Sequence, residues 1–275
     1  MRYSFKKILL RINKTSATLI LENTLIKSRN KESTKIKILV INHVPEVDLG
    51  SYEEFMTSDR HNFERFYFAS LKNPPSVDEY DALWVMGGPM NVWEENRYPW
   101  LVKEKIFIKN WVLNLEKPFF GICLGHQLLG EALGASVIRS QTPEIGFKKI
   151  SVNQKAPPNN LLRNFSEDML VLQGHSAEIA NFSKKEVSVL ASSDNCSIQA
   201  LSYLNHAFSV QFHPEVVDET IQSWISIPKI KQDFYGALGT DGIAETLDYQ
   251  QKNRRSLIKG AKLIYKNWLN LIEKN

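Results

Sequence analysis

The chain has 275 residues, of which 43% are hydrophobic and 23% charged, with 13 glycines and 11 prolines. This composition is typical of globular proteins and excludes collagen-like, low-complexity and wholly disordered chains. No stretch approaches the roughly 18 consecutive apolar residues of a membrane-spanning helix, so we predict no membrane association. Two cysteines are too few for a disulfide framework or a multi-cysteine metal site, which favours a reducing, cytoplasmic compartment.

The net charge of +4 arises at the start of the chain. Residues 1–34 carry eight basic and two acidic residues, whereas the remainder is slightly acidic. We predict that 1–34 is a basic, flexible extension, because neither a signal sequence nor a transit peptide is well formed there. Since the basic excess is confined to this arm, we predict no nucleic-acid partner. A single domain over 35–275 accounts for the rest.

Short apolar runs alternate with helical patterns in the first half of this domain. Nearly continuous apolar residues predict buried strands at 36–41, 82–86 and 119–122. Helical spacing over 101–115 ends at Pro118, and a second helix reaches residue 133 before Gly134. Alternation of this kind predicts an α/β fold with a parallel sheet.

The second half is rich in strands and closes with a helix. An amphipathic pattern predicts the closing helix over 257–271. The segment 225–247 either connects to this helix or covers the site as a lid, and we favour the connection. The order of elements predicts an antiparallel extension of the sheet. The predicted strands of this half are 150–152, 169–172, 187–190, 197–201 and 207–212.

Cys123 ends a predicted strand, has glycines at both ±2 positions and is followed by a predicted helix. This pattern is typical of a nucleophile elbow, in which small neighbours permit a strained strand-to-helix turn. The helix N-terminus would lower the thiol pKa, and the backbone N–H of Leu124 would bind an oxyanion. The alternative is a buried structural cysteine. Cys196 has no such surroundings, and we predict a structural role for it.

A thiol nucleophile needs a base with an orienting partner. His213 follows an apolar strand and precedes Pro214 and Glu215, so it could form a relay with Cys123 and Glu215. The alternative is a surface histidine in a proline turn. We do not predict His126 as the base, since a residue three positions along the helix cannot easily serve a nucleophile on the elbow.

Four segments together resemble the class I glutamine amidotransferases. They are Gly-Gly-Pro at 87–89, Gly-Ile-Cys-Leu-Gly-His-Gln at 121–127, Leu-Gln-Gly-His-Ser-Ala-Glu at 172–178 and Gln-Phe-His-Pro-Glu at 211–215. Their form is similar to stand-alone proteins related to the glutaminase domain of GMP synthase, some of which are γ-glutamyl peptidases. The resemblance implies a flavodoxin-like, three-layer fold with a mostly parallel central sheet, flanking helices and a small antiparallel extension.

The resemblance also implies roles for particular residues. Cys123 would attack a γ-glutamyl amide, His213 would move the proton and Glu215 would orient His213. Gly88 and Leu124 would supply the N–H groups of the oxyanion hole. Substrate-binding residues implied by the resemblance are Gln127, His175 and Ser176; the alternatives are a helix-packing amide and a structural turn.

The sequence constrains the substrate and any partner protein less than it constrains the type of chemistry. The chain has neither a phosphate-binding G-x-x-x-x-G-K-[ST] loop nor a Ser-Gly-Gly-x-Asp-Ser signature. We expect no cofactor or metal, and hydrolysis or transfer of a γ-glutamyl amide of a small molecule through a γ-glutamyl thioester. Alternatives are a glutaminase subunit that passes ammonia to a separate synthetase partner, a silent binding module, and an isomerase or chaperone. Residues 173–176 differ from the Ser-His-Gly-Asp of GMP synthases, which leaves the exact substrate open.

Overall fold

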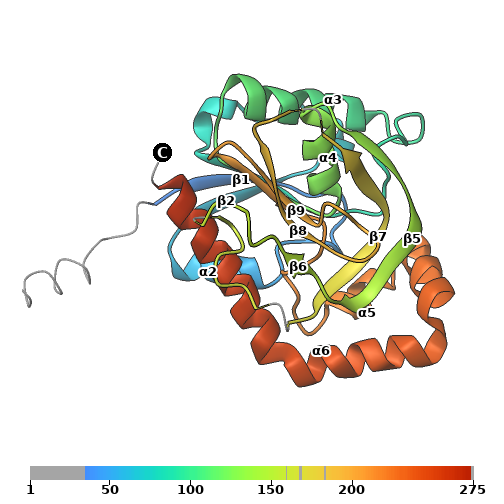
Figure 1. Ribbon diagram of the computed structural model, residues 1–275. Coiled ribbons are helices and arrows are strands. Elements are labelled where there is room, and N and C mark those ends of the chain that lie inside the picture. Colours follow the sequence, from blue (N-terminus) through green and yellow to red (C-terminus); the bar gives the residue numbers. More distant parts are fainter. Residues whose placement is uncertain (1–34, 159, 167–168, 183, 274–275) are drawn as a thin grey trace, which may run out of the picture. The chain divides into compact units, whose positions relative to one another are not determined.

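The structure is a computed structural model that describes residues 35–158, 160–166, 169–182 and 184–273 (Figure 1). The predicted extension at 1–34 lies outside the described residues. Ile36–Asn275 form one compact unit.

A mixed eight-stranded sheet runs through this unit in the order β2-β1-β3-β4-β10-β9-β8-β6. Its parallel part consists of β2 (Asn62–Phe66), β1 (Lys37–Ile41), β3 (Ala82–Val85), β4 (Phe119–Ile122) and β10 (Ala207–Val210). The antiparallel part consists of β9 (Ala200–Tyr203), β8 (Val187–Ser192) and β6 (Ser151–Val152). A separate antiparallel pair joins β5 (Ser136–Lys148) to β7 (Val171–Asn181). These pairings confirm the predicted α/β fold.

Helices cover both faces of the sheet, which gives three layers (Figure 1). Since successive side chains of a strand point to opposite faces, the residues of β1 divide between two cores. Ile38 and Val40 pack in the core that includes residues of α2 (Ser51–Ser58) and α6 (Pro228–Ile272). Leu39 and Ile41 pack in the core that includes residues of α3 (Trp100–Lys109) and α4 (Leu124–Ala132). The central strands β1, β3, β4 and β10 are therefore buried on both faces, as continuous apolar runs predict.

The remaining helical segments are short. They are the 3₁₀ turns Phe68–Ser70 and Val77–Glu79, the π-helical turn Asn110–Asn114 that continues α3, and α5 (Thr220–Trp224). The predicted helix over 101–115 is thus present as α3 and its π turn.

The C-terminal helix is longer than predicted. α6 begins at Pro228, not at residue 257, and bends at Gly239, whose φ of 65° interrupts the helix. The segment 225–247 is therefore largely helical and continues into the predicted helix. The elements that were not predicted include α2, α5, the edge strand β2, and β5, whose many exposed polar residues hide a strand pattern.

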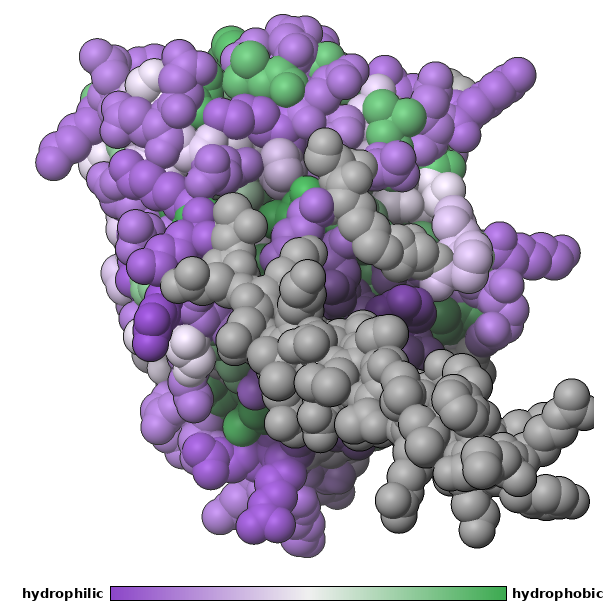
Figure 2. All heavy atoms as spheres, turned by 90° about the vertical axis from the view of Figure 1, so that its left-hand side faces the viewer, coloured by the Kyte–Doolittle hydropathy of each residue, from purple (hydrophilic) through white to green (hydrophobic). Residues whose placement is uncertain are grey.

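The face of the molecule in Figure 2 is mainly hydrophilic, with small separate hydrophobic patches. Within the described ranges, every helix is too short or too polar to cross a bilayer.

Candidate active site

Three predicted site segments meet at one edge of the sheet. β3, β4 and β10 are parallel, so their carboxyl ends lie at the same edge, where ligands of α/β sheets bind. The glycine loop Gly87–Gly88 follows β3, Cys123 follows β4, and His213 lies three residues beyond β10.

Cys123 occupies a strained turn between β4 and α4. Its φ is 51° and its ψ is −102°, a conformation that non-glycine residues rarely adopt. Both flanking glycines are required by close approach. A Cβ on Gly121 would lie 2.6 Å from the Gly125 oxygen, and a Cβ on Gly125 would lie 2.1 Å from the Val85 oxygen. The predicted elbow geometry is therefore present, and it presents Cys123 at the N-terminus of α4.

His213 is held between a carboxylate and the Cys123 thiol. Its Nδ1 lies 2.6 Å from Glu215 Oε1, and its ring packs edge-on against Trp224 with centroids 4.3 Å apart. Burial lowers the pKa of His213, but the charges of Glu215 and Cys123 and hydrogen bonds with both outweigh it and raise the pKa to about 10. The imidazole is thus protonated at neutral pH and can stabilise a thiolate.

The glycine loop lies directly against this pair. A Cβ on Gly87 would lie 2.8 Å from His213 Cε1 and 3.6 Å from Cys123 Cβ. Gly88 and Leu124, the two predicted donors to an oxyanion, both line the pocket above Cys123. Among the described residues, no group accepts a hydrogen bond from either backbone N–H. Both donors are therefore available to a ligand.

The three predicted substrate-binding residues also line this pocket, but two of them have protein partners. The Gln127 amide nitrogen donates to the Ala177 carbonyl at 3.1 Å and to Gln211 at 3.2 Å. His175 has Nδ1 3.0 Å from the same carbonyl and Nε2 3.2 Å from Glu144. Gln127 and His175 thus hold the pocket wall in place through the Ala177 carbonyl. Ser176 also lines the pocket, and its side chain has no hydrogen bond to another of the described residues.

The pocket has an outer wall formed in part by the segment 225–247, for which cover of the site is only the less favoured prediction from the sequence. Trp224 of α5 and Lys229, Ile230 and Asp233 of the first turns of α6 line it. Lys229 Nζ donates to the Pro89 carbonyl at 2.5 Å, which ties α6 to the glycine loop. Burial raises the pKa of Asp233, against the opposing effect of Lys229. The amphipathic pattern of α6 does not show which of its residues face the pocket. These individual residues could therefore be identified only from the position of α6 in the fold.

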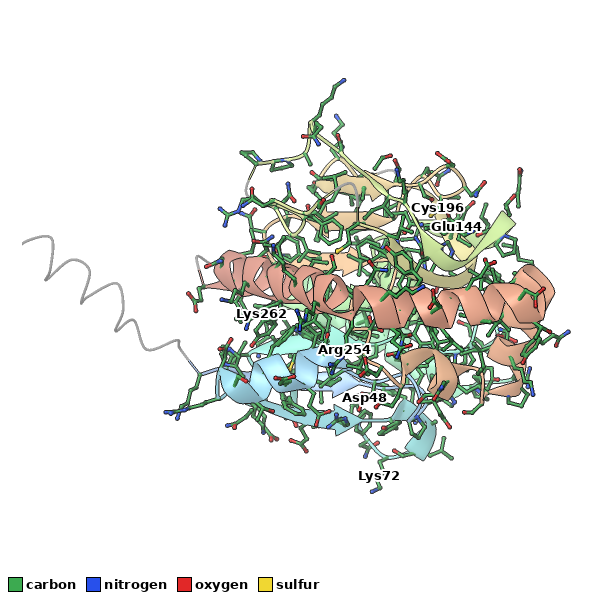
Figure 3. All side chains as sticks on the ribbon, turned by 90° about the horizontal axis from the view of Figure 1, so that it is seen from below. Asp48, Lys72, Glu144, Cys196, Arg254 and Lys262 are labelled. Atoms are coloured by element: carbon green, nitrogen blue, oxygen red, sulfur yellow. The ribbon has the colours of Figure 1, made fainter. Side chains whose placement is uncertain are left out.

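A second group of the same residue types reaches the pocket only through His175. The potential ligand atoms of this group, one each from Glu144, His175 and Cys196, lie within 4.8 Å of one another, which is close enough for a cation site. Figure 3 shows Glu144 and Cys196 side by side. However, Glu144 Oε2 already accepts hydrogen bonds from Ser193 at 2.8 Å and Gln199 at 2.7 Å. Burial raises the pKa of Cys196 to about 12, so its thiol is neutral. We interpret this group as a hydrogen-bonded structural cluster.

His126 lies in the core and is not the base. Its Nδ1 lies 2.8 Å from Ser209 Oγ and its Nε2 3.0 Å from the Ile198 carbonyl. Burial lowers its pKa to about 3, so the ring is neutral. It joins α4 to the strands beneath, in line with a supporting role.

Comparison with known proteins agrees with this geometry. The family model "Glutamine amidotransferase class-I" matches residues 54–225. The chain is 32% identical to the glutamine amidotransferase-like protein YfeJ of Salmonella typhimurium, over 68% of this chain and 80% of YfeJ. It is 35% identical to a glutamine-hydrolyzing GMP synthase subunit of Sulfurisphaera tokodaii, over 51% of this chain and 70% of that protein.

A solved structure is similar over almost all of the described domain. A glutamine amidotransferase from Thermotoga maritima superimposes with a TM-score of 0.74 and 27% identity, covering 85% of this chain and 98% of that one. Together with the family model, which covers more than half of the residues, this similarity shows that this chain belongs to the class I glutamine amidotransferases.

Proposed function

We propose that this chain hydrolyses or transfers a γ-glutamyl amide through a thioester on Cys123, with His213 as acid and base and Glu215 as its orienting partner. The observation that carries the proposal is the imidazole of His213, which bonds Glu215 at 2.6 Å and also contacts the thiol of the elbow cysteine. A thiol on a strained turn, a protonated imidazole and two free N–H donors are the components of acyl transfer.

The chemistry follows from these groups. The Cys123 sulfur attacks the side-chain carbonyl carbon, and the carbonyl oxygen becomes an oxyanion that accepts hydrogen bonds from Gly88 and Leu124. When the tetrahedral intermediate collapses, the C–N bond breaks and His213 gives its proton to the departing ammonia or amine. His213 then takes a proton from water, which attacks the thioester and releases glutamate and the thiol. Each N–H donor is worth about 2.7–4 kcal/mol in the transition state.

The outer wall supports recognition of a γ-glutamyl group rather than of a simple amide. Lys229 and Asp233 offer opposite charges beside the pocket, suited to the carboxylate and ammonium of an α-amino acid. The Asp233 carboxylate makes no hydrogen bond within the part of the chain that the structure describes. Gln127, His175 and Ser176 would complete this binding, the first two chiefly by holding the wall near Ala177.

A second candidate function is the delivery of ammonia to a separate synthetase. It is favoured by the similarity to GMP synthase subunits whose names describe glutamine hydrolysis. Such a protein would be slow with glutamine until its partner is added. Both free cysteines are compatible with a reducing compartment, so we propose that either reaction takes place in the cytoplasm.

The experiment is substrate profiling of the purified chain on glutamine, glutathione and γ-glutamyl amines, with and without a candidate synthetase. We expect release of ammonia or amine by the chain alone, and its loss in Cys123→Ala. Asp233→Asn should raise KM about tenfold with kcat little changed, because one ion pair to the substrate is lost. Asp241→Asn, exposed on the same helix, is the matched control.

Three results would contradict parts of the proposal. Turnover only with a synthetase would favour the second function. No turnover and no labelling of Cys123 by a glutamine-analogue electrophile would indicate a silent binding module. An equal effect of Asp233→Asn and Asp241→Asn would remove the outer wall from substrate recognition.

A further inference from the structure

A buried ion pair lies beneath the glycine loop. His43 lies two residues beyond the end of β1 and Glu104 lies on α3, and both side chains are 0% exposed. His43 Nε2 is 2.9 Å from Glu104 Oε1, and its Nδ1 is 2.9 Å from the Gly87 carbonyl oxygen. Neither residue takes part in the acyl-transfer steps.

The two contacts show which proton of His43 matters to the loop. The Gly87 carbonyl oxygen can only accept, so Nδ1 must donate to it, while Nε2 shares a proton with the Glu104 carboxyl group. Burial lowers the pKa of His43, but the charge and hydrogen bond of Glu104 and the carbonyls of Gly87 and Met86 outweigh it and raise the pKa. The raised pKa favours the charged form of this donor to the Gly87 carbonyl.

The Gly87 carbonyl and the Gly88 N–H belong to one peptide unit. Because this unit is planar and trans, its C=O and N–H point in opposite directions. A donor that holds the carbonyl on one side thus holds the N–H on the other, where Gly88 lines the pocket. The packing is also tight, since a Cβ on Gly88 would lie 2.8 Å from His43 Cβ. The peptide cannot rotate without breaking its bond to the His43 ring.

We propose that His43, held by Glu104, is a positioning residue that fixes the Gly88 N–H toward the oxyanion before substrate binds and without a partner protein. The inference rests on the proposed acyl-transfer function. The charged donor also polarises the peptide, which strengthens the N–H as a donor. Because this N–H is engaged most strongly in the transition state, loss of His43 should lower kcat and leave KM nearly unchanged.

Two substitutions separate the two ring nitrogens. The amide nitrogen of Asn can replace Nδ1 and keep the bond to Gly87, whereas that of Gln is placed to replace Nε2 and keep only Glu104. We expect His43→Gln to lower kcat about 10–100-fold, below the full 10²–10³-fold value of a lost oxyanion donor, and His43→Asn to lower it less than about fivefold. His206→Gln is the matched control, because His206 is also buried and its Nε2 bonds a carbonyl, that of Val112 at 3.0 Å.

A second readout tests position rather than stability. The γ-aldehyde of glutamate would form a hemithioacetal on Cys123, whose oxygen occupies the oxyanion hole. Its affinity should fall in His43→Gln by the same factor as kcat, while alkylation of Cys123 by iodoacetamide, which needs no oxyanion hole, should be unchanged. Thermal unfolding of each variant measures the structural cost separately.

The outcomes distinguish a failure of the proposed function from a failure of the role of His43. Wild-type protein without turnover and without aldehyde binding would overturn the proposed function. Active wild type with equal kcat losses in His43→Gln and His206→Gln, or an aldehyde affinity that does not follow kcat, would overturn the role of His43 alone. If His43→Gln does not fold, Glu104→Ala replaces it, since the ring then loses its anchor; kcat equal to that of His206→Gln would again overturn the proposal.

Discussion

Two groups among the described residues contain one cysteine, one histidine and one glutamate each, and only one of them places its cysteine in the pocket. Cys123 and His213 line the pocket and Glu215 bonds His213, whereas of Cys196, His175 and Glu144 only His175 reaches the pocket, and its Nε2 lies 3.2 Å from Glu144. Residue types are the same in both groups. The difference must come from backbone geometry and surroundings.

The surroundings act oppositely on the two thiols. Cys123 sits at a helix N-terminus in contact with His213, whose pKa is raised to about 10. Cys196 is 1% exposed and donates to the Ile198 carbonyl at 3.6 Å, and burial with nearby carboxylates keeps it protonated. A Cys-His-Glu set therefore indicates a nucleophile only when the thiol also has a strained turn and an opening.

The largest expected effect separates the two cysteines directly. Cys123→Ala should lower kcat by roughly 10⁴-fold or more, because the covalent route is lost, while Cys196→Ala should change it less than about threefold. Ammonia release from the best substrate is the measurement. Comparable losses in both variants would break the comparison.

Chemical labelling should separate them by about three orders of magnitude in rate. With a pKa of about 12, Cys196 has a thiolate fraction near ~10⁻⁴ at pH 8, whereas Cys123 is paired with an imidazolium. Alkylation by iodoacetamide, located by peptide mass spectrometry, should modify Cys123 first and Cys196 only after unfolding. Rapid labelling of native Cys196 would contradict its assignment as structural.

The two glutamates should differ in what they support. Glu215→Gln should lower kcat roughly 10²–10³-fold with little change in KM, since His213 loses its orienting partner. Glu144→Gln should lower kcat less than about tenfold, because its effect reaches the pocket only through His175. Steady-state kinetics measures kcat for both variants. Equal losses of kcat would show that Glu144 supports catalysis as much as Glu215 does.

The smallest expected effect is a pH-dependent loss of stability at Glu144. Its pKa is lowered because hydrogen bonds from His175, Ser193 and Gln199 outweigh burial. The unfolded state therefore binds the proton more readily, so the stabilisation is present above the unfolded value of 4.5 and is lost as pH falls through the folded pKa. Glu144→Gln should lower the free energy of unfolding by about 1–3 kcal/mol at pH 7.

Denaturant unfolding of wild type and Glu144→Gln across pH 3–7 tests this sign. The difference between them should shrink as pH falls below 4.5. Glu245→Gln, exposed on α6, is the control and should show no such dependence. A difference that grows on acidification would mean that Glu144 is neutral in the folded protein.

Much of the site was predictable because its signals are local. The glycines around Cys123 indicate a turn that only small neighbours allow, because a Cβ on Gly121 or Gly125 would overlap with nearby backbone atoms. The buried strands were predictable from continuous apolar runs. The edge strand β2 and the polar β5 were missed because their exposed faces carry no such pattern.

The sequence by itself determined the strand-turn-helix around Cys123, the parallel core strands and the family, since each depends on neighbouring residues or short motifs. Only the tertiary structure decided which Cys-His-Glu set faces a pocket, because side chains 90 residues apart meet through strand order, as Cys123 and His213 do. The same holds for Lys229 and Asp233 on the pocket wall and for His43 beneath the glycine loop. Their roles depend on long-range packing, which no local pattern of residues records.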